Sequence, residues 1–135
     1  MGGRVRVIVT GSRNWEGIGA ENRIQTVLNI VLALADTLGQ KLTIVHGGCP
    51  TGADQAIDRW ARRRDDSGVD VEVYAADWGS FGRAAGPLRN RHMTTEGADM
   101  CIAFIRESSR GATGTAQLAM NQGIATFVVR WEEPE

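Results

Sequence analysis

The chain has 135 residues, a formal net charge of -1, 42% hydrophobic residues and 23% charged residues. These values predict one globular domain, residues 1–135, and the lack of a global basic field argues against nucleic-acid or membrane partners. Two cysteines and two distant histidines favour neither a disulfide framework nor a zinc site, so we expect no metal and no cofactor. No signal-peptide pattern follows Met1, and we expect a cytoplasmic protein.

Short apolar runs alternate with amphipathic segments along the chain. The β-branched run at residues 4–10 is typical of a buried strand. Residues 20–38 place Ile24, Leu28 and other apolar residues at helical spacing, and Gly39 is typical of a helix end. We expect further strands at residues 42–45, 69–75, 100–105 and 125–129, and further helices around residues 56–61, 85–96 and 115–122.

This alternation predicts an α/β fold with three layers, α/β/α, around a five-stranded, mostly parallel sheet. Ligands of such sheets bind outside the carboxyl ends of the strands, near the point where the strand order reverses. Three segments with glycines lie between a strand and a helix, at residues 10–13, 46–54 and 111–115. Glycine lets a backbone approach a ligand closely, and helix N-termini attract anions. The sequence therefore predicts a nucleotide-like anion at this edge.

These segments supply most of the candidate ligand-binding residues. After the first strand, the Ser12 hydroxyl and the Arg13 guanidinium are suited to a phosphate, and we favour this interpretation over an ordinary tight turn with a solvated arginine. The remaining glycines and threonines are expected to cradle the ligand with their backbone. The candidates in this group are Gly11, Ser12, Arg13, Gly47, Gly48, Gly52, Gly111, Thr113, Gly114 and Thr115.

Two titratable residues lie in the second segment. Asp54 falls in the first turn of a predicted helix, where it either stabilises the helix dipole or accepts hydrogen bonds from ribose hydroxyls. His46 lies at a strand end, where we favour a structural histidine over a catalytic base.

The segment at residues 82–93 is rich in arginine. Arg89 lies about one helical turn from Gly86, so Arg89 and its neighbour Asn90 are candidate ligand-binding residues. Arg91 lies two positions further on and points to another face, which favours a surface or interface role.

The tryptophans divide into two groups. Trp15 and Trp78 both follow strand ends, where an indole can stack on a base. Trp60 fits a helix core position, and Trp131 fits packing near the C-terminus.

Together these segments resemble the SLOG superfamily, and most closely its small YspA/cpYpsA-related branch. The resemblance covers nearly the whole chain in the right order and is carried by residues 9–13, 45–48, 52–54, 76–78, 86–93 and 111–115. It implies a Rossmann-like fold that binds nucleotides or nucleotide-derived molecules. It also implies a homo-oligomer, because SLOG relatives are commonly oligomeric. The superfamily includes the LOG phosphoribohydrolases and the DprA DNA-processing proteins.

The chain departs from the LOG enzymes in one important position. Their motif is Pro-Gly-Gly-x-Gly-Thr-x-x-Glu, and this chain has Arg110 for the proline, Ala112 for the second glycine and Leu118 for the glutamate. Leucine cannot position a water or stabilise a developing positive charge. The only catalytic candidates are then Asp54 and Glu107, and whether the chain is an enzyme stays open.

We therefore expect a binding module that acts as sensor, carrier or sequestering agent for a nucleotide-derived ligand (ADP-ribose-like, cyclic or a mononucleotide). A LOG-like hydrolase of N-glycosidic bonds is the first alternative, and a DprA-like binder of single-stranded DNA is the second. The helix at residues 20–38 also has a wide apolar arc that includes Ile30 and Leu32. A partner subunit can bury such an arc, so we expect a homodimer or a higher even-numbered oligomer through this helix or the arginine-rich one.

Overall fold

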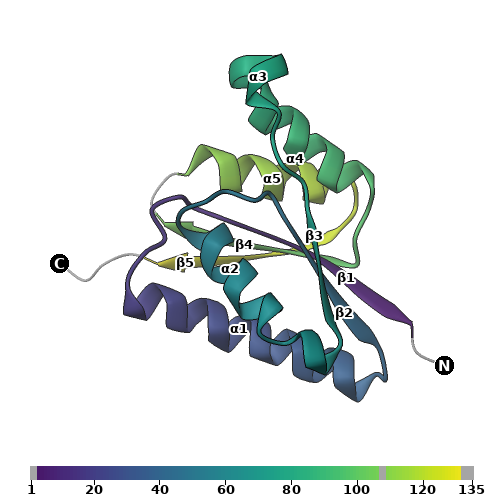
Figure 1. Cartoon of the computed structure of the whole chain (residues 1–135). Coiled ribbons are helices and arrows are strands. Elements are labelled where there is room, and N and C mark those ends of the chain that lie inside the picture. The colour runs from purple at the N-terminus through teal and green to yellow at the C-terminus, as the bar shows by residue number, and fades with distance from the viewer. Residues whose placement is uncertain (1–2, 107–108, 132–135) are drawn as a thin grey trace.

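The computed structural model describes residues 3–106 and 109–131 and has three layers (Figure 1). All five strands of its sheet are parallel, in the order β3-β2-β1-β4-β5. The strands are β1 (Arg4–Gly11), β2 (Lys41–His46), β3 (Val69–Val73), β4 (Met100–Arg106) and β5 (Ala125–Trp131). The helices are α1 (Ile18–Thr37), α2 (Ala53–Arg62), α3 (Trp78–Phe81), α4 (Ala85–Thr95) and α5 (Arg110–Asn121), with 3-10 turns η1 (Asp65–Ser67) and η2 (Gly82–Ala84). The predicted α/β/α fold is confirmed.

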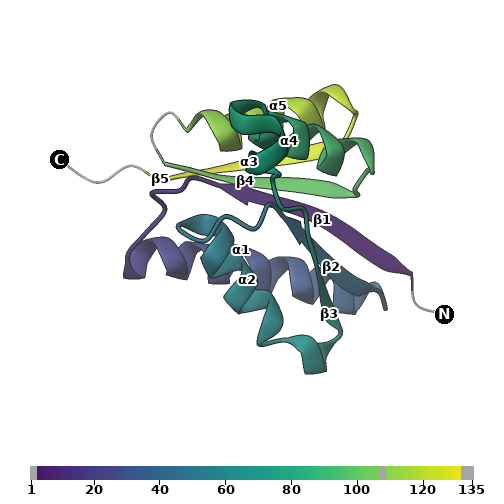
Figure 2. The same ribbon diagram turned by 45° about the horizontal axis from the view of Figure 1, so that its top comes forward.

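Alternate residues of the central strand β1 pack into the two helical layers. Val7 and Val9 lie fully buried in a cluster with α1 and α2, whereas Ile8 lies in a second cluster with Met93 of α4 and Ala119 of α5. The inner strands β1, β2 and β4 are mostly buried, and their buried segments are rich in apolar residues, whereas the edge strands β3 and β5 are largely exposed. Figure 2 shows the same layers from another angle, with α1 and α2 below the sheet and α4 and α5 above it.

The strand order reverses at β1. From β1 the chain adds β2 and then β3 on one side, and afterwards adds β4 and then β5 on the other side. The carboxyl ends of β1 and β4 therefore splay into helices on opposite faces, which opens a crevice at this edge. No helix of the described residues is long and apolar enough to cross a membrane.

Two elements differ from the sequence prediction. The helix expected at residues 115–122 begins at Arg110, so residues 111–115 form its first turns rather than a loop. Neither Gly111 nor Gly114 has a positive φ, so both fit a helix, where each costs about 1 kcal/mol relative to alanine. The short α3 was not predicted, and it projects beyond the three layers (Figure 1).

Candidate functional site

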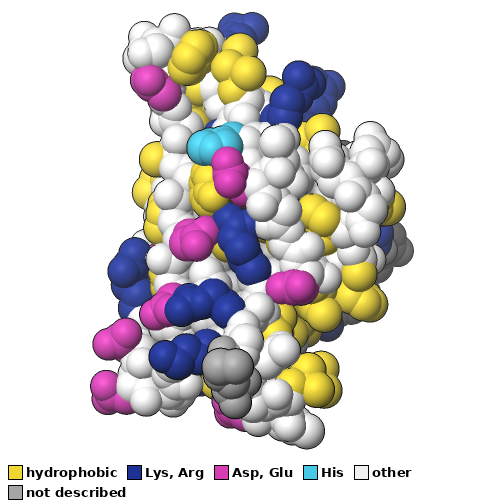
Figure 3. Space-filling view, turned by 90° about the vertical axis from the view of Figure 1, so that its right-hand side faces the viewer, with side chains coloured by type: hydrophobic (Ala, Val, Ile, Leu, Met, Phe, Trp, Pro, Cys, Tyr) yellow, Lys and Arg dark blue, Asp and Glu magenta, His cyan; other side chains and the backbone are white. Residues whose placement is uncertain are grey.

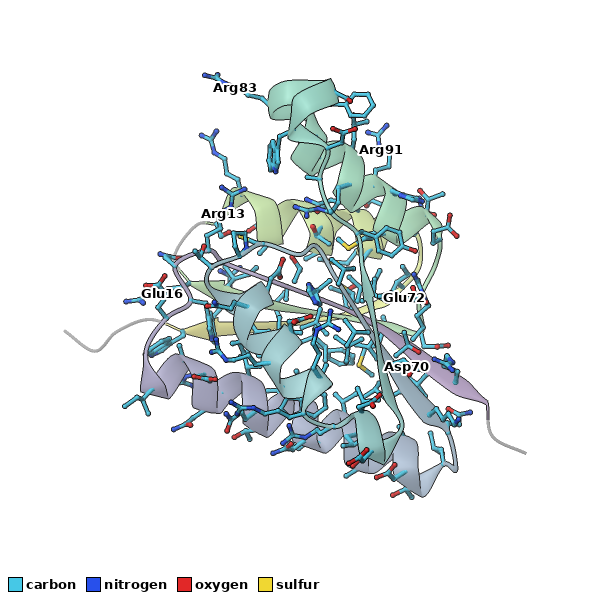
Figure 4. All side chains as sticks on the ribbon, viewed as in Figure 1. Arg13, Glu16, Asp70, Glu72, Arg83 and Arg91 are labelled. Carbon is cyan, nitrogen blue, oxygen red and sulfur yellow. The ribbon has the colours of Figure 1, made fainter. Side chains whose placement is uncertain are left out.

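The reversal point holds a cleft of about 840 Å³. Its walls come from the ends of β1 and β4, the first turns of α5, and α3 together with α4. Arg13, labelled in Figure 4, rises from the loop after β1 toward this cleft. The volume lies within the range typical of sites for small molecules and cofactors.

The described lining of the cleft is strongly cationic. It contains five arginines but a single carboxylate, that of Asp54. The five are Arg13, Arg89, Arg91, Arg106 and Arg110. Four of them form no ion pair with any carboxylate of residues 3–106 and 109–131, namely Arg13, Arg89, Arg91 and Arg110.

Two arginines of β1 outside the cleft are paired with carboxylates instead. Figure 3 shows another face of the molecule, where basic and acidic side chains lie next to one another. Arg4 pairs with Asp70, and Arg6 pairs with Glu72 at 2.8 Å, so ion pairs between β1 and β3 neutralise these two arginines. The cleft therefore holds several arginines without acidic partners among the described residues, which favours an anionic ligand.

Glycines of α5 form a smooth wall of the cleft. Gly111 and Gly114 both line it, and a Cβ added to either would meet no atom within 4 Å. The fold therefore does not need glycine at these positions, although glycine weakens a helix. Their absent side chains leave room for a ligand against the helix backbone, near its N-terminus.

The two threonines of this segment do not line the cleft. Thr115 is fully buried, and its hydroxyl donates a hydrogen bond to the Gly111 carbonyl at 3.1 Å. The prediction that Thr115 contacts the ligand is therefore wrong, because the helical turn places its side chain in the core. Thr113 is exposed and lies outside the cleft lining.

Arg89 is held by backbone carbonyl groups. Its Nη1 donates to the Gly47 carbonyl at 2.5 Å and to the Tyr74 carbonyl at 3.4 Å, and its Nε donates to Asn90 Oδ1 at 2.6 Å. A Cβ on Gly47 would collide with the guanidinium, so glycine at this position makes room for Arg89. Burial lowers the pKa of Arg89, while the nearby Asp54 acts in the opposite direction.

Asp54 organises the loop beside it. Its side chain is 7% exposed, lines the cleft and accepts a hydrogen bond from the Cys49 backbone N–H at 3.1 Å. Burial raises the pKa of this carboxyl group, although loop N–H groups, His46 and Arg89 partly offset the effect. The position allows contact with a ribose hydroxyl, which stays a prediction.

His46 completes the support of the same loop. Its Nδ1 accepts a hydrogen bond from the Gly48 N–H at 3.0 Å, so its Nε2 carries the proton and donates to Asp58 at 2.8 Å. The ring is 2% exposed and both nitrogens are satisfied. The geometry agrees with a structural histidine.

The structure contradicts two predicted contacts near the end of β1. Ser12 is 1% exposed, and its Oγ accepts from the Arg106 N–H at 2.9 Å, so it links β1 to β4 rather than a phosphate. Trp15 is 2% exposed and packs edge-on against Phe104 and Trp131, so it cannot stack on a base. In both cases the residue after β1 packs into the protein. The Ser12 hydroxyl satisfies a backbone group of Arg106, and the large apolar area of the Trp15 indole is buried in the core.

Several candidate glycines serve the fold instead. A Cβ on Gly11 would collide with Ala53, so glycine here lets β1 approach the start of α2 closely. Gly52 has a φ of +69° and lies against the Arg13 carbonyl, which leaves no space for a side chain. Of the two, only Gly11 also lines the cleft.

The other candidates are placed as follows. Trp78 is 50% exposed and lines the cleft, as does Asn90. Trp60 is buried in the core, as predicted. Glu107 lies outside the described residues.

Sequence reasoning missed three of the arginines. Arg91 lines the same cleft as Arg89 although the two are only two positions apart, because the cleft extends along α4. Arg106 ends β4, which pairs with β1, and this pairing brings Arg106 to the cleft. Arg110 replaces the motif proline and begins α5.

Comparison with known proteins agrees with this fold. The family model described as "YspA, cpYpsA-related SLOG family" matches residues 5–81. The chain belongs to this SLOG family. It is also 40% identical over 124 residues to the Gene 61 protein of Mycobacterium phage D29, across 88% of this chain and 91% of that protein. No solved structure matches the chain significantly. SLOG membership supports a role in binding or modifying a nucleotide-related ligand.

Proposed function

We propose that this SLOG domain binds a nucleotide or a nucleotide-derived ligand in the cleft and acts as a sensor, carrier or sequestering module. The observation that carries the proposal is the meeting of five arginines with the open glycine wall of α5 in one cleft. Arginine matches phosphate oxygens in geometry and charge. The aromatic face of Trp78 at the rim suits a base.

Binding without turnover is favoured by the lining. Leu118 lines the cleft at the position where LOG enzymes carry their glutamate. Asp54 is the one carboxylate of the described lining, and a backbone N–H of the loop already engages it. A hydrolase remains the second candidate because Asp54 has a raised pKa, which suits a general acid.

The test is calorimetry with AMP, ADP, ADP-ribose, cyclic AMP and adenosine, together with native mass spectrometry of gently purified protein. We expect the phosphorylated compounds to bind and adenosine to bind at least tenfold more weakly. Absence of any bound ligand, and of binding at millimolar concentration, would refute the proposal. Chromatography for free adenine after incubation with AMP separates the hydrolase: turnover that Asp54→Asn abolishes would favour it.

A further inference from the structure

A second hollow of about 460 Å³ adjoins the cleft. Loop residues 47–51 and the segment after β3 line it. Four residues line both spaces and form a ridge between them: Arg13, Cys49, Trp78 and Arg89.

The ridge offers two cations and an aromatic face. The guanidinium carbon of Arg13 lies 5.9 Å from the centroid of the Trp78 ring. Arg89 uses Nη1 and Nε within the protein, whereas its Nη2 has no hydrogen-bond partner among the described residues. Two arginines at one ridge are suited to a phosphate group that crosses it.

Apart from the ridge residues, two of which are arginines, the described lining of the second hollow consists of small, uncharged residues. Its other described lining residues are Gly47, Gly48, Pro50, Thr51, Ala75 and Ala76, none of which is charged. The main cleft, in contrast, carries the further arginines Arg91, Arg106 and Arg110. The two spaces therefore differ in both size and charge, and the smaller one suits an uncharged group such as a sugar.

We infer that the cleft and the second hollow hold the two arms of one ligand, which is joined by a phosphate bridge across the ridge. The chemical class is a pyrophosphate diester with a nucleoside on one arm and a neutral sugar, or a second nucleoside, on the other. The inference rests on the proposed function and narrows the class of ligand, because a mononucleotide would leave the second hollow empty.

The test compares ADP-ribose with ADP, which lacks only the second arm. Calorimetry on the wild type should give at least tenfold tighter binding of ADP-ribose. Thr51→Trp places a bulky ring at an exposed residue of the second hollow and should reduce ADP-ribose binding to the level of ADP, with ADP unaffected. Thr26→Trp makes the same change at an exposed position of α1 outside both spaces and should alter neither affinity.

Thiol labelling gives an independent measurement. Cys49 is partly exposed on the ridge, whereas Cys101 is fully buried and burial raises its pKa to about 12. A thiol reagent should therefore modify Cys49 alone in the native protein, and saturating ADP-ribose should slow this reaction at least fivefold.

Three results would overturn the inference while leaving the proposed function intact: equal affinity for ADP and ADP-ribose, an equal loss of both in Thr51→Trp, or unchanged Cys49 labelling with ADP-ribose bound. Failure of the wild type to bind either compound at millimolar concentration would instead refute the proposed function itself, and the inference with it.

Discussion

Replacing Gly114 should stabilise the protein while it weakens ligand binding. Gly114 is an interior residue of α5, its φ is not positive, and a Cβ there meets nothing within 4 Å. Gly114→Ala should therefore raise the free energy of unfolding by roughly 0.5–1 kcal/mol through helix propensity, with no steric cost to offset it.

The same methyl group would occupy the space where a phosphate meets the helix. We expect Gly114→Ala to weaken AMP binding by at least tenfold, or about 1.4 kcal/mol, and Gly114→Val to abolish it. Urea unfolding measures the first effect and calorimetry the second. Opposite signs for the two effects distinguish a ligand-contacting glycine from a structural one.

Gly19→Ala is the matched control. Gly19 lies in the first turn of α1, outside the cleft lining, and its Cβ would meet Trp131 at an ordinary 3.6 Å. This variant should leave binding unchanged. If Gly114→Ala binds AMP as tightly as the wild type, the α5 wall is not part of the site. If it destabilises the protein, the fold needs this glycine and the reasoning fails.

Three further predictions follow. Arg13→Ala should weaken AMP binding by about 1.5–3 kcal/mol, barely change adenosine binding and leave the stability of the protein unaltered. Arg89→Ala should weaken AMP binding to a similar extent and also destabilise the protein, because Arg89 donates a hydrogen bond to the Gly47 carbonyl. Calorimetry and urea unfolding measure the two effects, and equal losses of AMP and adenosine binding would show that the arginine acts through the structure. Because burial raises the pKa of Asp54, the native state keeps this carboxyl group protonated at pH values above its ordinary pKa of 3.8. The free energy of unfolding of the wild type, relative to Asp54→Asn, should therefore fall as the pH rises above about 4. An increase of this difference with pH in urea unfolding would contradict the raised pKa. We also propose that the chain self-associates through α1, where the apolar side chain of Ile30 is 56% exposed. Light scattering should give the mass of a dimer or larger oligomer for the wild type and of a monomer for Ile30→Glu, and a monomeric wild type would disprove self-association.

The place of the candidate site in the fold could be predicted, but the choice of side chains could not. The glycine segments were expected at the carboxyl edge of the sheet, and residues of all three line the cleft there, because parallel strands bring their carboxyl ends together. Ser12 and Trp15 were assigned to the ligand because they follow a strand, yet both point into the protein. Arg106 and Arg110 were missed although they line the cleft. A strand end indicates where a residue lies, whereas the packing of the next element decides where its side chain points.

The sequence by itself determined the order of strands and helices and the parallel sheet, because apolar spacing reports the local burial of each element. Only the tertiary structure decided which polar groups meet. Arg89 reaches the Gly47 carbonyl across 42 residues, and the Ser12 hydroxyl reaches Arg106 across 94. Such contacts depend on how α4 and the strand ends pack against one another. Because no local pattern encodes that packing, the cationic cleft and the smaller hollow beside it could be found only in the folded chain.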